Sequence, residues 1–357
     1  MSQIRHLSVA LSHTLVAFAI EYDNDWESRF WLPMEAKTLR VSMVMWENFL
    51  RFVPPQGTSL RTLSTKAGYP NGKSHPCIAG MLRWGFVTAS APPNGRRGKL
   101  DQIVRPTRAG LQAGECWAPL ADEIERRWCT RFGSGNIRDL KAALVGLVDQ
   151  FKTPLPRFLP VLGHLDGMRM PVPHQPDEDL AQDLSLPGLL SKAIHRYAIE
   201  FEETSVVSLA HRANVLRVLS AVPLPVRTIP ARSGISKEAL KMASGFLIKS
   251  GHVLEEPAAT GRGKALRLTD RGMNERDRYG ALHQTMEKRW ENAFSHDVLS
   301  HLRSTLNALL SHDDGQESPL FAGLTAPPDT WRSTRTKRAV LPDHPMVLHR
   351  GGWPDGS

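Results

Sequence analysis

Residues 261–272 read GRGKALRLTDRG, a glycine-flanked basic tip followed by a short alternating stretch and then Leu-Thr-Asp-Arg-Gly. Residues 95–110 read GRRGKLDQIVRPTRAG, which repeats these features in a looser form. In each copy, two short extended runs around a Gly-rich tip predict a β-hairpin. The same supersecondary element is therefore expected twice in one chain, which indicates an internal repeat.

The repeat extends over most of the chain. Residues 60–69 (LRTLSTKAGY) align with 226–235 (VRTIPARSGI) without a gap, and after the basic tips Trp128 aligns with Trp290. Each copy has roughly the size of one domain. We therefore predict repeat 1 at 1–167, a Pro-rich linker at 168–187 and repeat 2 at 188–357.

Two shorter matches extend the repeated unit at both ends. Residues 18–23 (FAIEYD) resemble 197–202 (YAIEFE), and the dipeptide at 155–156 resembles the one at 341–342. The segment 311–340 is rich in Ser, Asp, Thr and Pro and has no counterpart in repeat 1. We expect this segment to be a mobile insertion.

Composition limits the class of protein. Hydrophobic residues make up 41% of the chain and the mean hydropathy is −0.30, as in ordinary globular proteins. No apolar run approaches the ~18 residues of a membrane span, and three cysteines suit a reducing cytoplasm better than a disulfide framework. The net charge of +9 favours an anionic partner, although a merely basic surface explains it equally well.

The order of segments in repeat 2 predicts a winged helix. A short helix over 226–233 should end at Gly234, a residue suited to the left-handed turn after a helix. Ser236 then stands where an N-cap would start a second helix. The hairpin follows directly, and Leu-Thr-x-x-Gly begins a long helix with one apolar stripe. We expect a mainly α fold with small β-hairpin wings.

This order of helices, wing and Leu-Thr-x-x-Gly resembles the multiple antibiotic resistance regulator (MarR) family of winged-helix transcription factors, over about residues 10–151 and 189–310. The resemblance implies subunits that pair through their first and last helices, each with one recognition helix in the major groove. For this chain it implies two tandem winged helix-turn-helix domains that form an intramolecular pseudo-dimer. Further dimerisation stays open.

DNA binding needs cations that face phosphates and donors that face base edges. The candidate wing-tip cations are Arg96, Arg97 and Lys99 in repeat 1, and Arg262 and Lys264 in repeat 2. The candidate recognition-helix residues are Lys73, Ser74 and His75 in repeat 1, and Ser236, Lys237, Lys241 and Ser244 in repeat 2. The residues that begin the first helix of each helix-turn-helix, and form candidate phosphate clamps, are Arg61, Thr62, Arg227 and Thr228.

Each assignment has a structural alternative. A basic hairpin can serve solubility alone, and the threonines can simply N-cap their helices. In repeat 1, Pro70, Gly72 and Pro76 should delay or shorten the recognition helix, with Ser74 capping a helix that begins near His75. The two halves are therefore not expected to read the same half-site. Either the DNA target is asymmetric, or repeat 1 contacts mainly the DNA backbone while repeat 2 recognises the base sequence.

Signals for other functions are weak. No Walker loop or other enzyme motif occurs, so we expect no enzyme and no cofactor. The 14 histidines are scattered, which argues against a metal site, and Cys77 is more often core filling than a redox sensor. Trp26, Trp31 and Trp46 either line a pocket for a small apolar effector or add packing between the halves.

The sequence thus predicts a cytoplasmic, non-enzymatic transcriptional regulator that binds double-stranded DNA sequence-specifically. Its recognition helices are expected in major grooves and its basic wings in minor grooves. No membrane partner is expected. The competing hypothesis is a protein-interaction module on a winged-helix scaffold without DNA binding, which the altered recognition segment of repeat 1 favours.

Overall fold

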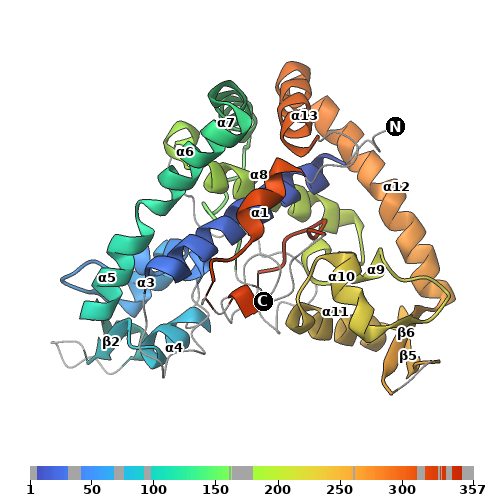
Figure 1. Cartoon of the computed structure of the whole chain (residues 1–357), viewed down its shortest axis with the longest axis horizontal. Coiled ribbons are helices and arrows are strands. Elements are labelled where there is room, and N and C mark those ends of the chain that lie inside the picture. Colours follow the sequence, from blue (N-terminus) through green and yellow to red (C-terminus); the bar gives the residue numbers. More distant parts are fainter. Residues whose placement is uncertain are drawn as a thin grey trace.

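A computed structural model describes residues 6–30, 42–67, 76–91, 98–160, 162, 180–259, 262–311, 318–328, 330, 332–334 and 340–347. Within these ranges the chain is mainly helical, with two small antiparallel sheets. Figure 1 shows the sheets at opposite ends of the molecule and helices crossing its centre. Among the described helices, the 24-residue α12 included, none combines the length and apolarity that a bilayer crossing requires.

The first half of the chain contains one winged helix. The helices before it are α1 (Leu7–Arg29) and α2 (Met43–Glu47). The helix-turn-helix and wing comprise β1 (Thr58–Ser59), α3 (Leu60–Lys66), α4 (Pro76–Arg83), β2 (Val87–Ser90) and β3 (Ile103–Pro106), with strand order β1-β3-β2. The helices after it are α5 (Arg108–Trp117), α6 (Leu120–Phe132) and α7 (Ser134–Val148).

The second half repeats this order. Its first helices are α8 (Leu186–Thr204), a π-helical turn (Leu209–Ala213) and α9 (Asn214–Leu216). The winged helix comprises β4 (Leu224–Pro225), α10 (Ile229–Ser233), α11 (Lys237–Lys249), β5 (Val253–Pro257) and β6 (Lys264–Leu268), with strand order β4-β6-β5. The last helices are α12 (Asp270–Ala293) and α13 (His296–Leu310). Helix α8 thus includes the last residues of the predicted linker 168–187.

The Thr-x-x-Gly pattern, Pro-Thr-x-x-Gly in the first half and Leu-Thr-x-x-Gly in the second, starts a helix in both halves. Thr107 Oγ1 accepts a hydrogen bond from the Gly110 N–H (3.1 Å), and Thr269 Oγ1 accepts one from the Gly272 N–H (3.0 Å). Each threonine thereby satisfies a free amide of the first helical turn. A Cβ on either glycine would lie 2.0 Å from a backbone carbonyl oxygen, so the close approach of helix and wing requires glycine.

The turn of the second helix-turn-helix also follows the prediction. Gly234 ends α10 with φ +75°, in the left-handed region that favours glycine. Ser236 Oγ accepts a hydrogen bond from the Ala239 N–H (3.0 Å) and so caps α11. Helix α11 has 13 residues and α4 has 8 described ones, while the predicted cap Ser74 lies outside the described residues.

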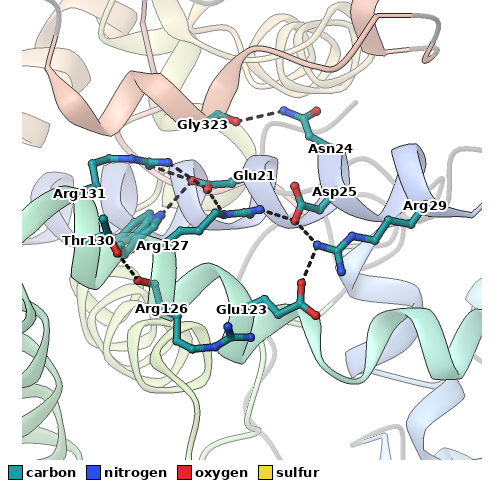
Figure 2. A network of polar contacts seen from close by, with 11 residues as sticks. Glu21, Asn24, Asp25, Arg29, Glu123, Arg126, Arg127, Thr130, Arg131 and Gly323 are labelled. Carbon is teal, nitrogen blue, oxygen red and sulfur yellow. Dashed lines mark hydrogen bonds and ion pairs between the residues drawn. The ribbon is translucent and has the colours of Figure 1, made fainter.

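A buried glutamate ties α1 to α6 in the first half (Figure 2). Glu21 accepts hydrogen bonds from Trp128 Nε1 (2.9 Å) and from both terminal nitrogens of Arg131 (3.0 and 3.1 Å). Arg127 forms an ion pair with the same carboxylate (3.0 Å). Figure 2 shows both arginines reaching from α6 toward α1. Several charge-assisted contacts thus satisfy the buried carboxylate.

The second half contains the equivalent contact. Glu200 on α8 accepts a hydrogen bond from Trp290 Nε1 on α12 (2.9 Å), and Arg196 and Arg289 form ion pairs with it. Glu200 and Trp290 align with the residues of the first contact in the sequence repeat. The repeated FAIEYD and YAIEFE segments therefore meet the repeated tryptophans in space, a pairing that the sequence prediction missed.

The helices of the two halves pack directly on one another. Helices α1 and α8 cross the centre of the molecule, and α7 and α13 meet at the top of the view in Figure 1. The Leu7 N–H at the start of α1 donates to Glu287 Oε1 on α12 (2.6 Å). Buried apolar residues of both halves form one continuous core. Because they share this core, the halves form one packed body.

Residues 340–347 lie between the halves. Ser12 Oγ on α1 donates to the Pro342 carbonyl oxygen (2.8 Å), and Asn214 Nδ2 on α9 donates to the His344 carbonyl oxygen (2.7 Å). The segment therefore contacts helices from both halves of the chain through its backbone.

The same segment touches the second helix-turn-helix and the first half. A Cβ on Gly234 would lie 2.4 Å from the Leu341 carbonyl carbon, so the segment rests on the turn itself. The Leu162 N–H donates to the Val347 carbonyl oxygen (2.8 Å). Residues 340–347 thus connect the turn of one unit to the segment that follows the other unit.

Several residues of 311–340, the segment predicted to be a mobile insertion, pack against the first half. Pro319–Leu324 forms a 3-10 helix against α1, with Leu320 buried, and Asn24 Nδ2 donates to the Gly323 carbonyl oxygen (3.2 Å; Figure 2). Arg332 forms an ion pair with the buried Asp23 (3.0 Å). A polar composition suggested no packing, but a few apolar side chains and one arginine suffice to anchor the segment.

Candidate nucleic-acid interface

The two helix-turn-helix units lie along one edge of the molecule. In Figure 1, α4 and β2 lie at the lower left, α11, β5 and β6 at the lower right, and α7 and α13 at the opposite edge. This arrangement presents both candidate recognition helices and both wings on the same side.

Helix α11 has a buried face and an exposed cationic face. Ala239 and Ala243 are buried, whereas Lys237 and Lys241 are exposed and form no ion pair with any described residue. These lysines are four residues apart and so share one side of the helix. The half-buried Ser244 donates its hydroxyl to the Lys241 carbonyl oxygen (3.3 Å), which leaves the lysines as the better-placed donors.

The wing of the second half carries cations and carboxylates together. Arg262 is exposed at its tip. Lys264, however, forms an ion pair with Glu255 (2.6 Å), and the neighbouring Arg267 forms one with Glu256 (3.0 Å). Of the predicted wing cations here, only Arg262 has no carboxylate partner among the described residues. The sequence prediction did not weigh the two glutamates.

The wing of the first half is described in part. The predicted site residues outside the described residues are Lys73, Ser74, His75, Arg96 and Arg97. Lys99 is exposed just before β3. Arg105 on β3 is also exposed, and it donates to Ser90 Oγ on β2 (3.0 Å). Arg105 was not predicted, although its alignment with Arg267 in the repeat is a signal that could have found it.

The arginines at the helix starts differ between the halves. Arg61 on α3 forms an ion pair with Asp101 at the base of the wing (3.0 Å). The Arg61 side chain is 61% exposed, so this contact contributes at most about 1 kcal/mol and leaves the guanidinium within reach of another anion. Arg227 is exposed, with no ion pair to the described part of the chain. Both arginines remain candidates for phosphate contact.

Neither threonine side chain caps its helix, contrary to the structural alternative, although Thr228 occupies the N-cap position of α10. The Thr62 N–H donates to Ser59 Oγ (3.0 Å), so the serine that precedes α3 is its cap. Thr228 donates its hydroxyl to a backbone carbonyl oxygen three residues earlier (2.8 Å) and gives α10 no side-chain cap. Each threonine hydroxyl instead forms a hydrogen bond with the residue three positions before it.

Tryptophans of the first half pack against one another. Trp117 on α5 stacks on Trp26 of α1 (centroids 4.6 Å apart) and on Trp46 of α2 (5.8 Å), whereas Trp31 lies outside the described residues. Trp26 and Trp117 are almost fully buried. The stacked rings fill the space between three helices of the first half, so Trp26 and Trp46 pack within that half and not between the halves.

No protein-family model and no curated protein matches the chain. Matching solved structures include a MarR-family transcriptional regulator from Silicibacter pomeroyi, which is 23% identical, with the match covering 37% of this chain and 91% of that chain at a TM-score of 0.27. A TM-score this low supports no conclusion. The winged-helix description therefore rests on this chain's own elements: in each half, a helix-turn-helix leads directly into an antiparallel hairpin.

Proposed function

We propose that this protein is a cytoplasmic, non-enzymatic transcriptional regulator that binds double-stranded DNA sequence-specifically. The observation that carries the proposal is the cationic face of α11, where Lys237 and Lys241 are exposed opposite the buried alanines. Helix α11 is the second helix of a helix-turn-helix, the element that enters a major groove in such proteins. The exposed Arg262 on the adjacent wing suits the negative potential of a narrow minor groove.

The two units are proposed to act together as an intramolecular pseudo-dimer. Their identical strand order and their position along one edge of the molecule support this arrangement (Figure 1). In such a pseudo-dimer the recognition helices would enter successive major grooves about 34 Å apart. The first unit, with its altered recognition segment, would contribute less to base readout than the second.

Replacing Lys237 and Lys241 with alanine is expected to change which sequences the protein prefers. Both side chains project from the face that would meet base edges. Selection of bound sequences from a random pool of duplexes measures this preference. If the double variant selects the wild-type motif with equal enrichment, α11 does not read bases.

Replacing Arg262 and Lys264 with alanine is expected instead to weaken binding to all sequences. Each lost phosphate contact should reduce the slope of log K against log salt by about 0.9. Since Lys264 is paired with Glu255, Arg262 should account for most of the change. A mobility-shift titration at several salt concentrations measures the slope, and an unchanged slope would remove the wing from the interface.

The second candidate function is a protein-interaction module without DNA binding. The ion pairs of Lys264 and Arg267 with wing glutamates favour it, because they neutralise a surface that would otherwise attract DNA. Absence of binding to any duplex at low salt, where electrostatic binding is strongest, would support this candidate and end the first proposal.

A further inference from the structure

The two wings have the same geometry but different charges. In the hairpin of the first half Thr88 faces Arg105, and in that of the second half Leu254 faces Arg267. Each arginine reaches diagonally to the adjacent strand. Arg105 donates to the Ser90 hydroxyl (3.0 Å), where Arg267 meets a carboxylate.

That carboxylate belongs to Glu256, which stands at the position that Ser90 occupies in the first wing. Its distance to Arg267 is 3.0 Å. A serine hydroxyl leaves the charge of an arginine uncompensated, whereas a glutamate cancels it. The first hairpin strands, β2 and β3, contain one ionised side chain, that of Arg105, and no acidic one.

The second hairpin has no net charge along its strands. Strands β5 and β6 carry Glu255, Glu256, Lys264 and Arg267, which form two ion pairs. A phosphate that approaches these cations must displace a carboxylate and then lie beside it. The repulsion between the two anions opposes that exchange.

Arg105 is held by contacts with Gly57 and Ser90 before any DNA arrives. Its stem crosses the backbone at Gly57, where an added Cβ would lie 2.6 Å from Arg105 Cγ. Gly57 has φ +88°, which also favours glycine. The hydrogen bond to Ser90 orients the guanidinium while leaving the side chain exposed. Fixing the side chain in advance reduces the entropy lost on binding.

We infer that Arg105 contacts a DNA phosphate beside the first wing, while Glu255 and Glu256 prevent Lys264 and Arg267 from making the equivalent contacts. The strands of the first wing contact the phosphate backbone of the duplex, and those of the second wing do not. Contact by the second wing is confined to its tip. This inference rests on the proposed DNA binding. It adds that the two wings differ in charge, and that Ser90 in the first wing and Glu256 in the second determine the difference.

Exchanging the two residues tests the inference. Ser90→Glu should pair with Arg105, lower the affinity about fivefold to tenfold at 0.1 M salt and reduce the salt slope by about 0.9. Glu256→Ser should release Arg267, and should therefore raise the affinity and increase the salt slope. The measurement is fluorescence anisotropy of a labelled duplex about 40 base pairs long, which spans roughly four helical turns, titrated at several salt concentrations.

Matched controls remove the effect of total charge. Ser304→Glu on α13, at an exposed residue, and Asp139→Ser on α7, where the side chain is 47% exposed, make similar charge changes at the edge of the molecule opposite the wings (Figure 1). They should change the affinity by less than about twofold, because screening limits distant charges. Circular dichroism melting curves verify that each variant is folded. A third variant, Arg105→Gln, should reproduce the loss caused by Ser90→Glu.

The outcomes separate the inference from the proposed function. If the wild-type protein binds the duplex and both exchanges leave affinity and salt slope unchanged, the inference is wrong and the proposed DNA binding stands. If the exchanges act no differently from their controls, the inference is equally wrong. If the wild-type protein binds no duplex even at low salt, the proposed function fails and the inference fails with it.

Discussion

Replacing Glu21 with alanine is expected to lower the free energy of unfolding by about 3 kcal/mol. The carboxylate is buried and accepts hydrogen bonds from Trp128 Nε1 and Arg131. Without it, the indole N–H and a guanidinium that is only 20% exposed remain without an acceptor. The expected loss lies at the low end of the range for removing one partner of a buried ion pair, because Arg127 is 40% exposed and can turn toward water.

Urea denaturation followed by circular dichroism measures this loss. Glu203→Ala is the matched control, because Glu203 is 54% exposed and its contact to Arg289 is long (3.5 Å). The control should shift the free energy by no more than about 0.5 kcal/mol. Glu200→Ala should behave like Glu21→Ala, since Glu200 accepts the equivalent bond from Trp290. Equal stabilities of the Glu21 and Glu203 variants would show that the buried Glu21 carboxylate contributes nothing to the free energy of unfolding.

Gly272→Ala is expected to destabilise the protein by about 2–4 kcal/mol, because its methyl group would overlap backbone. The new Cβ would lie 2.0 Å from the His252 carbonyl oxygen. A backbone carbonyl cannot rotate away as a side chain can, so α12 or the wing must shift. That shift would disturb the cap that Thr269 provides. Gly110→Ala should have the same effect against the Phe86 carbonyl oxygen.

Gly280→Ala provides the control within the same helix. Nothing lies within 4 Å of a Cβ at Gly280, and the position is exposed. Alanine should therefore stabilise α12 by up to about 1 kcal/mol through its helix propensity. Thermal melting of both variants distinguishes the two cases by the sign of the change. A destabilised Gly280 variant beside an unaffected Gly272 variant would contradict the geometry.

Features that depend on neighbouring residues could be predicted from the sequence. The cap at Ser236, the left-handed turn at Gly234 and the helix starts at Thr107 and Thr269 all formed as expected. Each involves groups within a few residues of one another, where sequence spacing determines geometry. The repeat also predicted that the helix-turn-helix and hairpin occur twice.

Features that join distant segments could not be predicted in this way. Glu21 and Trp128 are 107 residues apart, and Asp23 and Arg332 are 309 apart. The residues next to Glu21 or Asp23 in the sequence do not indicate which distant residue each one contacts. The repeat does contain a partial signal, because the glutamate and the tryptophan recur together in both halves. The charge of the second wing was missed for a different reason, since only strand register shows that Glu256 reaches Arg267.

The position of residues 340–347 restricts how the two units can move. The segment rests on the turn at Gly234, bonds to α1 through Ser12 and bonds to Leu162 of the first half. One unit therefore cannot rotate independently of the other without breaking these contacts. For a DNA-bound protein the consequence is a dependence on helical phase. Inserting about five base pairs between half-sites would turn one of them to the far side of the duplex, beyond the reach of a rigid pair of units.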